Sequence, residues 1–203
     1  MTNNQQSTIN KKVQKVKIVQ KEAPVLRGVA RNVPIKDIKT KKIQDIIRKM
    51  QKALHAEEDG VAIAAPQIGE GLRIFVVNGF VTNQPLGHPM SKYNRTSDVQ
   101  VKEKPPNDLV FINPEIVKLS RKKMEVEEGC LSVRWYYGLV KRSEKATVQA
   151  HDETGKKFEK GASGLLAQIF QHEIDHLNGV LFTDKATSIE NLPPKETTKN
   201  GKK

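Results

Sequence analysis

The residues best suited to chemistry form a short motif near the C-terminal end, His172-Glu173-Ile174-Asp175-His176. On a helix, residues four apart project from the same face, so both imidazoles could bind one metal ion. Glu173 is about 100° further round the helix, where it could reach a water on that metal without ligating it. This HExxH pattern is typical of metals that activate water with a glutamate as base. The alternative is a helix with two surface histidines, but the surrounding apolar residues predict a largely buried helix, in which histidines need partners.

Two histidines need a third protein ligand to complete such a site. Phe182 stands where one zinc-protease pattern has its third histidine. Another protease class uses a downstream glutamate, but the only glutamates that follow are Glu190 and Glu196, both in a polar tail. Upstream, the single cysteine, Cys130, lies in the segment Glu-Gly-Cys-Leu-Ser. A thiolate is a good ligand for a borderline metal, although a lone cysteine is often just a small buried apolar residue. We therefore favour a Cys-His-His site with an open fourth position.

A third segment of interest runs from Gly60 to Gly69 with the sequence GVAIAAPQIG. Its small residues would let a backbone and a ligand approach closely. Gln67 offers an uncharged donor that could polarise a carbonyl group. Taken alone, the segment could equally be a strand and turn with a surface glutamine.

The elements that must position these residues are predicted from periodicity and turn signals. A helical period from Ile43 to Leu54, with Thr40 as a plausible cap, predicts an N-terminal amphipathic helix that ends before residue 59. Pro114 predicts an edge or bulge in its strand. Because strands dominate the middle and helices bracket them, we expect an α+β fold of short, mostly antiparallel strands around a central metal-binding helix. The expected strands are 72–77, 109–119, 124–128, 139–140 and 146–152, with a hairpin turn at 153–156 and the second helix at 164–177.

Length and composition limit the number of domains and the class of protein. The 203 residues carry a net charge of +12 and suit one ordinary domain, or two at most. No run approaches the ~18–20 apolar residues of a membrane span, and one cysteine excludes a disulfide framework. The lysine excess indicates either solvated tails or contact with a polyanion such as ribosomal RNA. We expect a partly disordered, lysine-rich extension at 1–22, a catalytic domain at 23–184 with a surface insertion at 81–108, and a polar tail at 185–203.

Together the three segments resemble the signature segments of the peptide deformylases: a GxGxAAPQ-like segment, then EGCLS, then QHExDHL, in that order and at similar spacing. The resemblance runs from residue 23, in the segment APVLR, to residue 184. It implies a hydrolase that removes the formyl group from the N-terminal formyl-methionine of new proteins by attack of a metal-activated water. The metal is usually Fe²⁺ in this family, with Zn²⁺ or Ni²⁺ as substitutes.

The resemblance also implies a role for each matched residue. Cys130, His172 and His176 would bind the metal, and Glu173 would be the general base. The Gln67 side chain and the backbone N–H of Leu131 would hold the developing oxyanion. The peptide would lie as an added strand along Gly60, Val61, Ala62 and Ile63, a mode that reads main chain rather than side chains.

The implied partners are N-formylmethionyl nascent peptides and the ribosome near its peptide exit, with no membrane, for a monomer in the bacterial cytoplasm or, alternatively, an organellar matrix. The sequence departs from the family pattern at Ala62, where a second glycine is usual, and at Arg134, where a proline is common. The aromatics at 135–137 could wall a substrate pocket or simply pack in a surface loop. The insertion at 81–108 is longer than in the simplest members, and the long C-terminal helix of some bacterial members is missing.

Two other functions are compatible with part of the pattern. A zinc endopeptidase built on HExxH lacks its usual third ligand here, since Phe182 takes that position. A catalytically inactive relative that binds nascent chains or the ribosome would be expected to have lost a motif residue. The residues with an implied chemical role are all intact, namely Cys130, His172, Glu173, His176 and Gln67, so we favour the deformylase.

Overall fold

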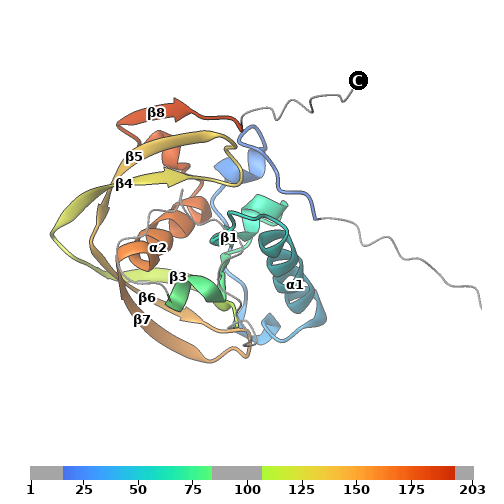
Figure 1. Ribbon diagram of the computed structural model, residues 1–203. Coiled ribbons are helices and arrows are strands. Elements are labelled where there is room, and N and C mark those ends of the chain that lie inside the picture. The colour runs from blue at the N-terminus through green and yellow to red at the C-terminus, as the bar shows by residue number, and fades with distance from the viewer. Residues whose placement is uncertain (1–15, 84–106, 195–203) are drawn as a thin grey trace, which may run out of the picture.

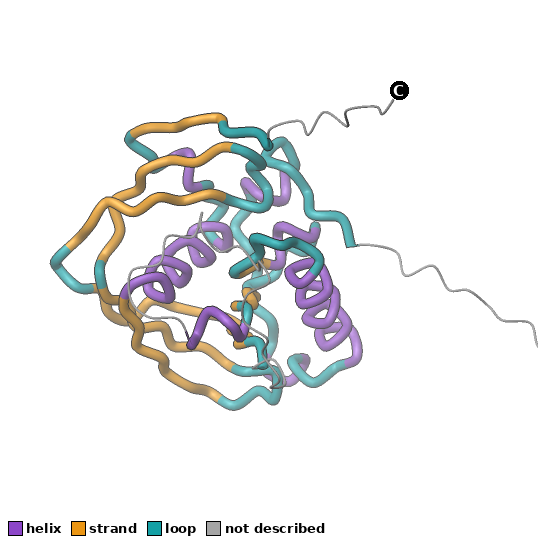
Figure 2. The backbone as a smooth tube through the Cα atoms, in the orientation of Figure 1, coloured by secondary structure: helices purple, strands orange, loops and turns teal. Residues whose placement is uncertain are grey.

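The computed structural model describes residues 16–83 and 107–194 (Figure 1). The expectations for residues 1–15, 84–106 and 195–203 lie outside this part of the chain. The described residues form an α+β fold in which the strands pair antiparallel in two sheets (Figure 2). The predicted fold class and the mostly antiparallel pairing are therefore confirmed.

The larger sheet has the strand order β1-β2-β3-β6-β7, which makes β1 an edge strand. The predicted bulge at Pro114 is present: the register of β3 against β6 shifts between Ile112 and Glu115, and Asn113 has a positive φ of 51°. Strand β7 was not predicted, because its residues lack a clear apolar alternation. The strands span Ala62–Ala64 (β1), Ile74–Val77 (β2), Leu109–Leu119 (β3), Lys145–His151 (β6) and Lys157–Ser163 (β7).

The smaller sheet has the order β4-β5-β8, with β4 at Lys123–Gly129, β5 at Tyr136–Ser143 and β8 at Ser188–Asn191. Strand β8 lies in the stretch expected as a polar tail and has four exposed residues, so no local signal predicted it. Its close fit against β5 depends on Gly138, where an added Cβ would lie 2.5 Å from the Ser188 carbonyl oxygen. The two strands pair through their backbones.

The first helix, α1, spans Lys41–His55 and buries its apolar stripe against the larger sheet. Thr40 is at the N-cap position, but its hydroxyl donates to the Asp37 carbonyl at 2.7 Å and does not cap the helix. Short 3-10 helices span Pro24–Arg27, Ile35–Asp37, Ala65–Ile68, Gly79–Asn83 and Phe182–Asp184.

The second helix, α2, spans Gly164–Leu177 and lies between the two sheets (Figure 1). It is buried over most of its circumference, including both histidines of the HExxH motif. Gly179 ends it with φ 75°, and a side chain there would meet the Arg27 carbonyl oxygen at 2.6 Å. None of the described helices is long and apolar enough to cross a membrane.

Candidate active site

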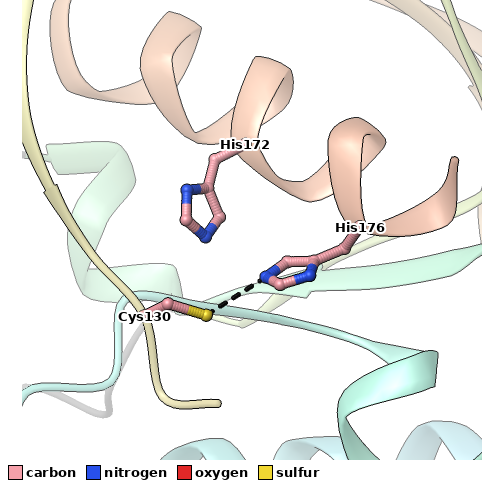
Figure 3. Close-up of side chains that lie close together, drawn as sticks. All are labelled: Cys130, His172 and His176. Atoms are coloured by element: carbon pink, nitrogen blue, oxygen red, sulfur yellow. Dashed lines mark hydrogen bonds between the residues drawn. The ribbon is translucent and has the colours of Figure 1, made fainter. Parts of the chain in front are cut away.

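One cysteine and two histidines from distant parts of the chain converge beside α2 (Figure 3). Cys130 directly follows β4, and His172 and His176 project from neighbouring turns of α2 toward it. One ligand atom from each lies within 4.8 Å of the others, and the Cys130 Sγ is 3.2 Å from the His176 Nε2. A thiolate and two imidazoles are a donor set that suits Fe²⁺, Zn²⁺ or Ni²⁺. The arrangement could hold one such ion and leave a position open.

The charge state of the cysteine fits this use. Burial alone would raise the pKa of the Cys130 thiol, but the adjacent His176 and His172 lower it to about 5. The thiol is therefore ionised at neutral pH, and the thiolate is the form that binds metals.

A buried carboxylate orients His172. The Glu128 side chain is fully buried, and its two oxygens accept hydrogen bonds from the Arg142 Nε and Nη2 at 2.7 and 2.9 Å. Burial opposes ionisation, yet bonds from Arg142 and His172 hold the pKa of Glu128 at about 2. An ionised carboxylate only accepts, so the His172 Nδ1, 2.9 Å away, must carry the proton. This leaves the Nε2 as the ring nitrogen that can bind a metal. Burial lowers the pKa of His172, but hydrogen bonds with Cys130 and Glu128 outweigh it and raise the pKa well above its ordinary value, so metal binding would displace the Nε2 proton.

This network extends to the protein surface. The Arg142 Nη1 donates to Asp175 at 2.6 Å, and the Lys185 ammonium donates to both Asp175 oxygens. Glu128, Arg142 and Asp175 were not among the residues predicted to act in the site. Glu128 lay inside the EGCLS motif and Asp175 inside HExxH, but nothing in the sequence distinguished Arg142 from a surface arginine.

Glu173 faces the same space as the ligand cluster. It is buried, and its Oε2 has no hydrogen-bond partner among the residues that the structure describes. Burial raises the pKa of Glu173 to about 7, against the opposing effect of His172 and His176. A carboxylate with a pKa near neutrality and a free oxygen is suited to exchanging a proton with a ligand.

Gln67 is buried, so its interpretation as a surface glutamine is wrong. Its Oε1 accepts the Ala64 N–H at 2.8 Å, which turns the Nε2 toward the Cys130 Sγ at 3.5 Å and the Ser132 Oγ at 3.3 Å. Leu131 follows the cysteine and lines the same pocket. The structure thus brings an amide donor and the Leu131 backbone next to the cluster.

A pocket of about 540 Å³ opens onto these residues. Of the expected substrate segment, Val61 and Ala62 line it. Gly60 instead packs closely on the Leu54 carbonyl, and the Ile63 side chain belongs to the core beneath α1. The three aromatics at 135–137 line the pocket, as the first of their two interpretations predicted.

Arg134 joins two segments that line this pocket. Its guanidinium donates to Asp59 at 2.6 Å and to Glu57 at 2.7 Å, which ties the turn after Cys130 to the connection between α1 and β1. The residue that departs from the family pattern is therefore held by two carboxylates, which also line the pocket.

The site combines the two histidines of an HExxH helix, a pattern typical of metallohydrolases, with a cysteine as the third candidate ligand. A family model described as polypeptide deformylase matches residues 15–192. The chain belongs to the polypeptide deformylase family.

Relatives and solved structures agree with this family. The chloroplastic peptide deformylase 1A of Solanum lycopersicum is 36% identical over 180 residues, which cover 86% of this chain and 62% of that protein. The peptide deformylase of Halothermothrix orenii is 40% identical over 166 residues, or 82% and 90% of the two chains. A class I type b peptide deformylase from Acinetobacter baumannii, crystallised with Met-Ala-Ser bound, superposes on this chain with a TM-score of 0.69 at 29% identity. The superposition covers 84% of this chain and 97% of that structure. The chain thus spans less than two thirds of that plant relative.

Proposed function

We propose that this protein is a peptide deformylase, a hydrolase that removes the formyl group from N-formylmethionyl peptides. The observation that carries the proposal is the convergence of Cys130, His172 and His176 in one cluster, with Glu173 beside it. One oxygen of Glu173 is buried and has no hydrogen-bond partner in the described part of the chain. Membership of the deformylase family supports the same activity.

The proposed metal is one Fe²⁺ held by Cys130, His172 and His176, with Zn²⁺ or Ni²⁺ as substitutes. A divalent ion there would supply Lewis acidity and lower the pKa of water in the site toward neutrality. Glu173 takes a proton from the attacking water on its carboxylate and later delivers it to the leaving amine. The Gln67 Nε2 and the Leu131 N–H donate to the oxygen of the formyl carbonyl as negative charge develops on it.

The proposed peptide site runs along Gly60, Val61, Ala62 and Ile63. Its support is that β1 is the edge strand of the larger sheet, to which an extended peptide can add. Binding through main-chain groups suits an enzyme that acts on many nascent proteins. The Acinetobacter baumannii relative was crystallised with Met-Ala-Ser bound, which supports a short methionyl peptide as ligand.

The wider setting is also a proposal. We propose that the protein acts as a monomer on nascent chains near the ribosomal exit, where its net charge of +12 would favour contact with RNA. Bacterial and plant organellar relatives leave two candidate compartments, the bacterial cytoplasm and an organellar matrix.

The decisive experiment compares two substrates on one sample. Protein purified anaerobically is assayed with a formyl-Met peptide and with casein, and its metal content is measured in parallel. We expect formate release from the peptide, about one metal per chain and no cleavage of casein. Casein cleavage without formate release would favour the endopeptidase, and neither activity in a metal-loaded sample would favour the inactive relative.

A further inference from the structure

Besides its contact with His176, the Cys130 sulfur accepts hydrogen bonds from two groups among the described residues. The Ser132 backbone N–H lies 3.4 Å from the Sγ, and the Gln67 Nε2 lies 3.5 Å from it. Donors to a ligand sulfur withdraw electron density from it and so tune the bound metal. Whatever holds these two donors in place therefore acts on the metal centre.

Two adjacent residues, Val19 and Gln20, donate to backbone carbonyls beside these two donors. The Gln20 Nε2 donates to the Leu131 carbonyl at 3.2 Å, and this carbonyl belongs to the same peptide group as the Ser132 N–H. The Val19 N–H donates to the Gln67 carbonyl at 2.9 Å. Val19 also packs against the cluster that contains Cys130, so the segment is anchored on both sides.

The two bonds of the Leu131–Ser132 peptide group reinforce each other. Donation to the carbonyl polarises the group and makes its N–H a stronger donor, as in other hydrogen-bond chains. We propose that Gln20 is a positioning residue of the metal centre, which sets the strength of the hydrogen bond from the Ser132 N–H to the Cys130 sulfur. The proposal rests on Cys130 as a metal ligand, which the proposed function also uses.

The test measures an absorption band that depends on the electron density of the Cys130 sulfur. The apoprotein is loaded with Co²⁺, and the sulfur-to-cobalt charge-transfer absorption is recorded for wild type and for Gln20→Met, Gln20→Glu and Gln20→Lys. Methionine and glutamate remove the donor, while lysine keeps one. Gln44→Met is the matched control, because the Gln44 Nε2 also donates to backbone carbonyls, those of Ile38 and Glu153, but on α1.

We expect the charge-transfer band to move to longer wavelength in Gln20→Met and further in Gln20→Glu. When the hydrogen bond from the Ser132 N–H to the sulfur is weaker, transfer of an electron from sulfur to cobalt needs less energy. The Co²⁺ dissociation constant should rise about three- to tenfold, below the 10–100-fold typical of direct outer partners. Gln20→Lys should stay near wild type, and Gln44→Met should not shift the band.

Thermal unfolding of each variant separates tuning from loss of fold. An unchanged band in both donor-free variants, or an equal shift in Gln44→Met, would overturn the proposal while leaving the proposed function standing. Absence of the band from wild type would overturn Cys130 as a ligand, and with it both proposals.

Discussion

The substitution Glu128→Gln tests the buried network behind His172. Three N–H groups, two from Arg142 and one from His172, converge on the two oxygens of Glu128. A glutamine has a single acceptor oxygen, and its own N–H₂ would face one of these donors. The variant also leaves the Arg142 guanidinium, whose side chain is only 5% exposed, without its fully buried counter-charge.

The expected cost follows from that burial. Removing one partner of a buried ion pair typically costs about 3–5 kcal/mol. Arg142 keeps its bond to Asp175, so we expect the lower end, about 3 kcal/mol. For a chain of this size that corresponds to a fall in Tm of about 6–12 °C. Because His172 also loses its acceptor, metal affinity should fall about 10–100-fold.

The assay pairs thermal unfolding with metal titration against a chelator. Glu125→Gln is the control, since it makes the same change at an exposed position on the same strand, β4. Adding Arg142→Met to Glu128→Gln should recover part of the lost stability, because it removes the uncompensated guanidinium. Equal Tm and equal metal affinity for Glu128→Gln and Glu125→Gln would refute the reasoning.

Three further predictions concern the site itself. Cys130→Ser should sharply reduce metal retention, because a neutral hydroxyl replaces a thiolate; wild-type metal content would show that Cys130 is no ligand. Glu173→Gln should keep metal and Tm while turnover of a formyl-Met peptide falls by about 10²-fold or more, and parallel loss of metal would make Glu173 a ligand instead. Ala62→Gly should cost about 1–2 kcal/mol of stability, since the methyl is buried in the core with α2. Its kcat/KM should stay within about threefold, whereas a gain of tenfold or more would mean that this methyl narrows the substrate groove.

Local patterns in the sequence predicted those features that depend on neighbours along the chain. Spacing of four placed His172 and His176 on one side of a helix, because the helical repeat fixes direction within a turn. Strand β3 was predicted over its observed range, and Pro114 marked its bulge, because proline cannot donate to a sheet ladder. Thr40 shows the limit of such signals, because its hydroxyl found a different backbone acceptor.

Features that depend on distant partners needed the tertiary structure. Strand β8 has no apolar alternation and exists through backbone pairing with β5. Arg142 is 14 residues from Glu128 and 33 from Asp175, so its burial between them is invisible in any local window. The same holds for Gln20, which meets the Leu131 carbonyl across 111 residues.

By itself, then, the sequence determined which groups could do the chemistry: a thiol, two imidazoles, a carboxylate and an amide in three short motifs. The tertiary structure decided what surrounds them, namely which carboxylate orients His172, which donors reach the sulfur and which side chains wall the pocket. The physical reason is that residue type and spacing encode chemical capacity and local direction. Burial and hydrogen-bond partners arise only when segments far apart in the chain pack together.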